Sequence, residues 1–333
     1  MLKVVYLIAS HKNPEQVYRL VKTIKNGSQG SVIIINHDFS SSFLDCNLFS
    51  KFKNVFIIKN FTQLNWGEFS IVKATLKTFE FILKNIEFEW VIFISGQDFP
   101  IQPLKQIESS LEKTFYDGFL SGVSIEKAIP CGMHECQINR SSVKRCPDCL
   151  DRYYYQYFLF PEAFYSRIFV PKIIKSCFNM LLPYLHLAQS LLRLKLTPFN
   201  GKHRLKIGIR SSFFDNKPRM PLYKGSQWFT LNRKCIEYIL NYVTNNPEIV
   251  TYYQRTIIPD ESFFQTILYN CQHLKINKNN KRFIVWQNSN AKNPNILTLG
   301  DFTDIISSGC HFARKFDITI DSNILDKLEK HIH

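Results

Sequence analysis

Short apolar runs alternate with amphipathic stretches through the first hundred residues, and this alternation constrains the fold more than any other feature of the sequence. Between the apolar runs, Pro14–Lys25 and Phe69–Lys84 repeat apolar residues at helical spacing, which predicts helices. Strand–helix alternation indicates an α/β protein with a mostly parallel central sheet and helices on both faces. The runs that we predict as buried strands are Lys3–Ile8, Ser31–Asn36, Asn54–Ile58 and Trp90–Ile94.

The rest of the chain divides into an insertion and a second half. We place the parts at residues 1–125, 126–224 and 225–333, and expect the middle part to be a basic helical insertion with a cysteine loop and apolar helices. In the last part we expect the strands Gly225–Leu231 and Phe283–Trp286, the helices Arg233–Val243 and Glu261–Asn270, and a terminal helix from Asp321.

The composition is typical of a globular protein. With 333 residues, 45% of them hydrophobic, the chain can bury a full core, and it has no run of about eighteen apolar residues. The segment Met1–Ile8 is too short for a signal peptide and predicts a first strand. We therefore expect a cytoplasmic protein.

Nine cysteines, an odd number, favour reduced thiols in a chain with no export signal. Four of them form a C-x4-C-x9-C-x2-C pattern, which suits a structural zinc ion because paired thiolates can hold a tetrahedral metal. The first pair is spaced loosely, so ordinary loop cysteines are the alternative. The four residues are Cys131, Cys136, Cys146 and Cys149.

Much of the formal charge of +15 is concentrated in one segment. Between Tyr165 and Lys224, twelve lysines and arginines accompany the single acid Asp215, and leucines are frequent from Met180 to Leu196. A basic apolar helix suits an anionic membrane surface better than nucleic acid, because its leucines need an apolar environment. The alternative is a packing helix with solvated ends. We expect peripheral binding at the inner membrane face and no nucleic-acid partner.

Polar residues follow three of the predicted strands. Ser10 and His11 follow the first strand, Asn36 and Asp38 the second, and Ser95–Asp98 the fourth. In open parallel sheets, ligands bind at the carboxyl ends of the strands. We therefore expect these side chains to meet at one edge of the sheet and line a site.

The segment Pro259–Ser262 places two carboxylates at a predicted helix start. We expect Asp260 to cap the helix and Glu261 to open it, where the positive helix end favours an ionised carboxylate. Such a glutamate can act as a general base or only as a capping charge.

Six segments occur in the order of one glycosyltransferase family. The chain resembles a bacterial-type member of the mucin core-branching and I-branching β1,6-N-acetylglucosaminyltransferases and peptide O-xylosyltransferases, glycosyltransferase family 14. The resemblance covers roughly residues 1–110 and 220–320. Animal members have an N-terminal Golgi anchor, and a chain without one suggests a bacterial setting. The segments are Ser10–Pro14, Asn65–Val72, Ser95–Pro100, Gly225–Leu231, Pro259–Ser262 and Phe312–Asp317.

This resemblance implies a GT-A-like nucleotide-sugar fold and a metal-independent, inverting reaction. The expected reaction transfers N-acetylglucosamine or xylose from a UDP-sugar to a hydroxyl of a surface glycan, such as a polysaccharide, a lipooligosaccharide or a lipid-linked oligosaccharide. Glu261 matches the catalytic base of the family. Residues 1–125 would bind the donor and residues 225–333 the acceptor, with no required cofactor.

Positive side chains would take the place of a metal at the donor diphosphate, because the sequence contains no Asp-x-Asp pair. By the resemblance, Lys315 matches the family lysine that contacts the diphosphate. Lys292 falls where the family has a second cation, and Arg314 is the alternative to it.

The resemblance also implies the residues around the donor sugar and nucleotide. Trp66 and Glu68 would face the donor. Asp98 lies where metal-using relatives of the fold have a metal-binding carboxylate, and here it would bind sugar hydroxyls. We expect His11 and Asp38 to contact the uridine.

On the acceptor side, Trp286 matches a tryptophan that stacks on the acceptor sugar, as aromatic faces suit a pyranose ring. The alternative for Trp286 is a place in the core. Gln227 and Trp228 would line the cleft through their backbone, with the Trp228 indole packed inward.

Two hypotheses from other classes compete with the transferase. The basic segment would suit a nonenzymatic membrane- or nucleic-acid-binding protein, and the cysteine loop would suit a zinc-bearing module. Both leave the six ordered segments unexplained. Specific binding of UDP without metal separates the transferase from both.

Overall fold

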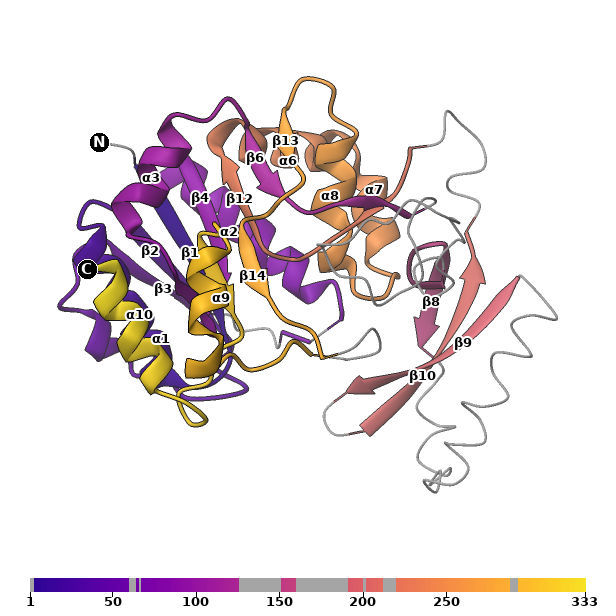
Figure 1. Ribbon diagram of the computed structural model, residues 1–333. Helices are drawn as coiled ribbons and strands as arrows, with labels where there is room; N and C mark the ends of the chain where they lie inside the picture. The colour runs from indigo at the N-terminus through magenta and orange to yellow at the C-terminus, as the bar shows by residue number, and fades with distance from the viewer. Residues whose placement is uncertain are drawn as a thin grey trace.

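The structure is a computed structural model that describes residues 3–59, 64–65, 67–125, 151–159, 191–199, 202–211, 220–287 and 293–333. Its body is a seven-stranded sheet in which the first four strands along the chain run parallel (Figure 1). The α/β class with a mostly parallel sheet is thereby confirmed. In spatial order the strands are β13 (Ile276–Asn277), β6 (Gly118–Leu120), β12 (Phe229–Asn232), β4 (Trp90–Ser95), β1 (Val4–Ser10), β2 (Val32–His37) and β3 (Val55–Lys59).

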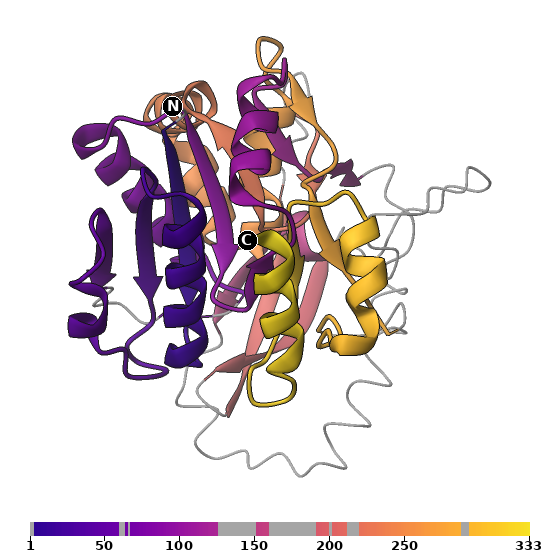
Figure 2. The same cartoon turned by 60° about the vertical axis from the view of Figure 1, so that its left-hand side comes forward.

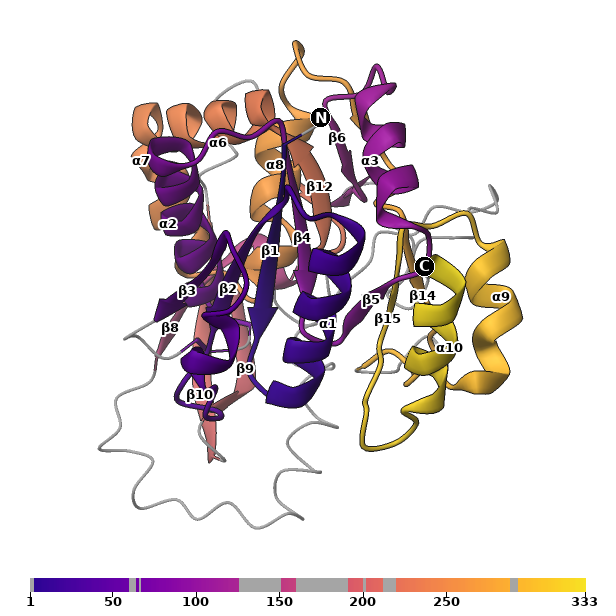
Figure 3. The ribbon, with the colours of Figure 1, turned by 90° about the vertical axis from the view of Figure 1, so that its left-hand side faces the viewer.

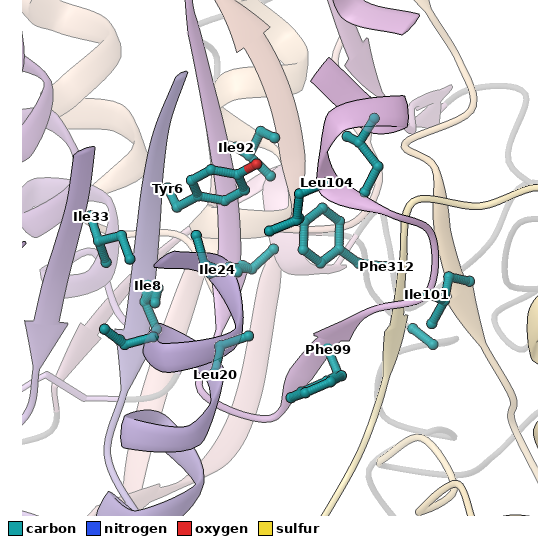
Figure 4. Packing of buried hydrophobic residues seen from close by; sticks show 14 of the residues in the cluster. Tyr6, Ile8, Leu20, Ile24, Ile33, Ile92, Phe99, Ile101, Leu104 and Phe312 are labelled. Atoms are coloured by element: carbon teal, nitrogen blue, oxygen red, sulfur yellow. The ribbon is translucent and has the colours of Figure 1, made fainter. Parts of the chain in front are cut away.

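Helices cover both faces of this sheet (Figure 3). In β1, Val5 and Leu7 belong to one core layer, whereas Tyr6 and Ile8 belong to the other, because successive strand residues point to opposite faces. Figure 4 shows Leu20 of the second layer beside Ile8. The first layer is covered by α2 (Ser70–Asn85), α6 (Arg233–Asn245) and α8 (Phe263–Tyr269), and the second by α1 (Pro14–Gly27), α3 (Leu104–Glu112) and α10 (Asn323–Ile332).

A three-stranded sheet joins the C-terminal part of the chain to the first half. Its central strand β15 (Phe312–Arg314) runs parallel to β14 (Arg282–Ile284) and antiparallel to β5 (Asp98–Pro100). Helices α1 and α10 lie side by side (Figure 2), and Arg19 of α1 forms ion pairs with Asp326 and Glu329 of α10. The C-terminal segment is thus fixed against the N-terminal helix.

Residues 192–199 and 202–210 of the insertion form β-strands, so the prediction of basic apolar helices is wrong there. β8 (Tyr155–Leu159), β10 (Lys202–Arg210) and β9 (Leu192–Phe199) form an antiparallel sheet (Figure 1). Leucines and cations alternate from Leu192 onward, and a period of two is typical of a strand. Ile209 and Leu192 face each other and stay 49% and 47% exposed, whereas Lys206 is buried. Residues 160–190 lie outside the described part.

The other predicted elements are present with shifted bounds. The strand expected at Gly225–Leu231 begins only at Phe229, and the terminal helix begins at Asn323. In the described ranges no helix combines the length and the apolar character needed to cross a membrane. The remaining elements are η1 (Cys46–Phe49), β7 (Val123–Ser124), β11 (Tyr223–Lys224), α7 (Pro247–Tyr253), η5 (Leu299–Asp301) and α9 (Phe302–Ser307).

The helix expected at Glu261 begins two residues later, and Asp260 does not cap it. Pro259–Glu261 form a single 3-10 turn, η4, and α8 starts at Phe263 without a side-chain cap. The Asp260 side chain is buried, and its Oδ1 has no hydrogen-bond partner among the described residues. Burial, and then the neighbouring charge of Glu261, raise the pKa of Asp260 to about 7.

This buried carboxyl predicts a pH-dependent stability. The pKa of Asp260 is about 7 in the folded chain, against about 3.9 in an unfolded one, so the folded state binds the proton more tightly. The resulting stabilisation is complete below about pH 4 and is lost once the pH exceeds about 7. Urea unfolding measures the free energy of unfolding at about pH 5 and pH 8. Between these two values the wild type should lose more of it than Asp260→Asn does. An identical pH dependence in both proteins would contradict a protonated Asp260.

Candidate active site

Three strands end at the same edge of the main sheet, as the sequence predicted. The Ser10 hydroxyl, at the end of β1, lies 2.7 Å from His37 Nδ1 at the end of β2. The Asp38 amide donates to the Ser10 carbonyl, and the Gly96 amide after β4 donates to the Ala9 carbonyl, both over 2.8 Å. The polar residues that follow these strands therefore form one continuous edge.

His11 and Asp38 both lie at this edge. The Asp38 carboxylate is buried and accepts hydrogen bonds from the Ser40 amide and from the hydroxyls of Ser40 and Ser41, so it holds the turn after β2. His11 keeps solvent contact, yet partial desolvation and then the charge of Lys12 lower its pKa. A neutral imidazole at this place offers one donor and one acceptor. Contact of either residue with uridine stays a prediction.

Asp98 is completely buried where β5 begins. Its Oδ1 accepts a 2.6 Å hydrogen bond from the Ser95 hydroxyl, and its Oδ2 accepts one from the Ser95 amide at 3.1 Å. The carboxylate has 0% exposure, so both oxygens are engaged by the protein itself. Its predicted contact with sugar hydroxyls stays a prediction.

Arg314 lies beside this carboxylate because β15 pairs with β5, a register that sets Arg314 opposite Asp98. The distance from Arg314 Nε to Asp98 Oδ1 is 3.1 Å, but the N–H does not point at that oxygen, so the contact is an ion pair without a directed hydrogen bond. The guanidinium stacks on Trp228, with Cζ 4.4 Å from the ring centroid. The Trp228 indole is 7% exposed and packs inward, as expected.

Lys12 and Lys315 bring two more cations to this edge. Lys12 Nζ lies 2.7 Å from Asp317 Oδ2, and Asn13 donates to the other oxygen of Asp317. Partial burial, and then the charges of Lys12 and Arg314, lower the pKa of Lys315. A group of neighbouring cations, here Lys12, Arg314 and Lys315, is typical of an anion-binding site. Sequence reasoning did not single out Lys12, although it lies in the first matched segment.

The turn that carries Glu261 is fixed by two glycines. The Gly225 amide donates to the Glu261 carbonyl over 2.7 Å, and a Cβ on Gly225 would lie 1.9 Å from the Ser121 carbonyl oxygen. The Gly67 carbonyl, in a residue with φ 76°, accepts from the Ile258 amide. Ile258 itself has φ 54°, a conformation that costs a residue of this kind about 1–3 kcal/mol. Such strain is concentrated at functional sites.

Two cations from the insertion reach the carboxylates of the site, and sequence reasoning missed both. Arg152 Nη1 lies 3.2 Å from Glu261 Oε2, and Lys206 Nζ lies 3.4 Å from Glu68 Oε1. About one third of the Glu261 side chain remains exposed. A guanidinium at this distance favours the ionised carboxylate that a general base requires. The basic character of the insertion was the available signal, but it does not identify partners.

Of the remaining predicted site residues, the structure describes only Trp286 and Gln227. Trp286, two residues after β14, and Gln227, two residues after Gly225, are both partly buried. Trp66 and Lys292 lie outside the described residues, as do the four cysteines of the predicted zinc site. Their roles stay predictions.

Comparison with known proteins gives a family match and several partial relatives. The profile described as "Branch: Core-2/I-Branching enzyme" matches residues 4–122 and 191–306. Beta-glucuronosyltransferase GlcAT14B of Arabidopsis thaliana is 33% identical over 114 residues, which make up 33% of this chain and 26% of that protein. Xylosyltransferase 2 of Homo sapiens is 32% identical over 130 residues, which make up 33% of this chain and 15% of that protein. The chain thus spans about a quarter or less of these relatives.

Solved structures resemble the chain only weakly. S. aureus TarS 1-349 in complex with UDP-GlcNAc is 15% identical and aligns with a TM-score of 0.28 over 42% of this chain and 38% of that one. A 4-diphosphocytidyl-2C-methyl-D-erythritol synthase from Anaerococcus prevotii is 10% identical, with a TM-score of 0.34 over 92% of this chain and 96% of that one. These scores are too low to add to the fold described above.

The profile match covers well over half of the chain. It includes the three strand ends, the Gly225–Leu231 segment and the turn of Glu261, and it stops before Lys315. The chain belongs to the Core-2/I-branching enzyme family of glycosyltransferases.

Proposed function

We propose that this chain is a metal-independent, inverting glycosyltransferase that transfers a sugar from a UDP-sugar to a hydroxyl of a surface glycan. N-Acetylglucosamine and xylose are the donors expected from the sequence, and the name of the Arabidopsis relative adds glucuronic acid to the donors worth testing. Glu261 is the general base, and Lys315 and Arg314 bind the diphosphate. A donor screen scored by UDP release in EDTA would identify the sugar.

The observation that carries this proposal is the role of the segment Gly225–Trp228. Its first residue holds the Glu261 carbonyl through a 2.7 Å hydrogen bond, and its last residue lies under the Arg314 guanidinium at 4.4 Å. One short segment therefore positions both a partly exposed carboxylate and a cation. Sugar transfer needs this pair, because a base must accept the hydroxyl proton while positive charge stabilises the leaving diphosphate.

Inversion requires a single base in this scheme. Glu261 takes the proton from the acceptor hydroxyl as the oxygen attacks the anomeric carbon opposite the leaving phosphate, and no covalent intermediate forms. Arg152 pairs with Glu261 and Lys206 pairs with Glu68, so the insertion contributes to the acceptor and donor sides. Burial, and then the charges of Lys12 and Arg314, lower the pKa of Lys315, and a bound diphosphate would offset those two charges.

The base assignment predicts a selective loss of catalysis. Glu261→Gln should bind UDP like the wild type and lose transfer by roughly 10²–10⁴-fold, because the amide cannot accept the proton. Transfer rates and UDP titration measure the two effects separately. Glu237→Gln makes the same chemical change in an exposed ion pair with Arg233 and should leave transfer unchanged. Near wild-type turnover of Glu261→Gln would remove this residue from the mechanism.

Fixed cations in place of a metal predict activity in excess EDTA. Lys315→Ala should lower the affinity for UDP by about 10–100-fold and leave the affinity for uridine nearly unchanged, because only UDP carries the diphosphate. Lys292→Ala should behave similarly. Calorimetric titration with both ligands measures this difference, and Lys330→Ala, an exposed lysine on α10, is the control. A strict requirement for added manganese or magnesium would contradict the proposal, as would a UDP affinity that Lys315→Ala leaves unchanged.

Peripheral membrane binding is a separate proposal that the exposed apolar face of the insertion sheet supports. Leu192, Ile209 and Phe158 are 40–49% exposed, and the chain carries a net charge of +15. Vesicles with anionic lipid should therefore bind the protein, and neutral vesicles should not. In a sedimentation assay Leu192→Ser should weaken binding, whereas Phe43→Ser, another exposed apolar position, should not. No binding to anionic vesicles at low ionic strength would refute the proposal.

A further inference from the structure

The Arg314 guanidinium is held in place, while its Nε donates no directed hydrogen bond to the described residues. Trp228 covers one face at 4.4 Å, and Asp98 lies 3.1 Å from Nε. The side chain is only 15% exposed, yet within the described ranges no group accepts a directed hydrogen bond from its Nε. Nε lies beside Asp98, so the terminal amines are the donors that an anion from outside the described structure would meet.

Asp98 has little capacity left for a ligand of its own. Ser95 donates to both carboxylate oxygens, at 2.6 Å and 3.1 Å, and the carboxylate is fully buried. A carboxylate that contacts a sugar hydroxyl or a metal must reach the cleft. Asp98 is instead fully buried with its Oδ1 3.1 Å from Arg314 Nε, and the Arg314 side chain keeps 15% exposure.

Trp228 provides a rigid support for the same guanidinium. Its ring centroid lies 5.2 Å from that of Phe93, and the residue is 7% exposed. The chain just before it is fixed, because the Ser226 amide donates to the Ser121 hydroxyl and Gln265 donates to the Ser226 carbonyl. The indole therefore cannot move away without disturbing this segment.

We propose that Asp98 and Trp228 are positioning residues that hold Arg314 as a fixed cation for the diphosphate of the donor. This inference rests on the proposed function, since it requires a nucleoside diphosphate at this edge. With a carboxylate near Nε and an aromatic ring beneath it, the guanidinium keeps a planar outer edge that suits two phosphate oxygens. A cation oriented in advance stabilises the leaving group without reorganisation.

A double-mutant cycle tests whether Asp98 acts through Arg314. Affinities for UDP and uridine are measured in EDTA for the wild type, Asp98→Asn, Arg314→Met and the double variant. Each single variant should lower the affinity for UDP by about 10-fold or more and the affinity for uridine by less than about twofold. The double variant should bind UDP no more weakly than Arg314→Met alone, because Asp98 then has nothing left to position. Additive losses would overturn the inference and assign Asp98 a donor contact of its own.

Variants of Trp228 and Ser95 test the same inference if Asp98→Asn fails to fold. Trp228→Leu should lower the affinity for UDP more than that for uridine. Trp228→Phe should keep most of the UDP affinity, because it retains an aromatic face under Arg314. Ser95→Ala, which removes the hydroxyl hydrogen bond to Asp98 and keeps the ion pair, should have a smaller effect than Asp98→Asn. UDP affinity unchanged in Trp228→Leu would overturn the positioning role of Trp228. A wild type that does not bind UDP would refute the proposed function itself, whereas additivity in a UDP-binding protein refutes only the positioning.

Discussion

The pairing of β15 with β5 is the contact on which the rest of the candidate site depends. Three ladder positions fix it, and the last of them sets Arg314 opposite Asp98. The chain then continues to Lys315 and to Asp317, which binds Lys12 and Asn13 directly after β1. Without this short ladder the C-terminal cations would have no fixed relation to the strand ends.

The first hundred residues could be predicted because local patterns decide their elements. The predicted strand Lys3–Ile8 is Val4–Ser10 in the structure, and the predicted helix at Pro14 begins at that residue. The capping role of Asp260 could not be predicted in the same way. Ile258 enters the left-handed region and the following turn tightens to 3-10 geometry, which turns Asp260 into the core. Composition does not specify that backbone conformation.

The prediction of helices in the insertion was wrong because it relied on the leucine content and not on the spacing of the leucines. Alternation from Leu192 onward was visible in the sequence and indicates strands, and it also separates the apolar face from the face of Lys206. The ion pairs of Arg152 with Glu261 and of Lys206 with Glu68 are a different case. Their partners lie 109 and 138 positions apart, and no local pattern in one sequence connects them.

The contact between Asn13 and Asp317 spans 304 positions, and this distance affects how the protein matures. During synthesis the parallel strands β1–β4 are made well before the segment that brings the cations to their edge. Contacts of such long sequence separation form slowly, because a large loop must close before they are gained. The edge of the sheet would therefore be completed only after the segment around Asp317 has been made.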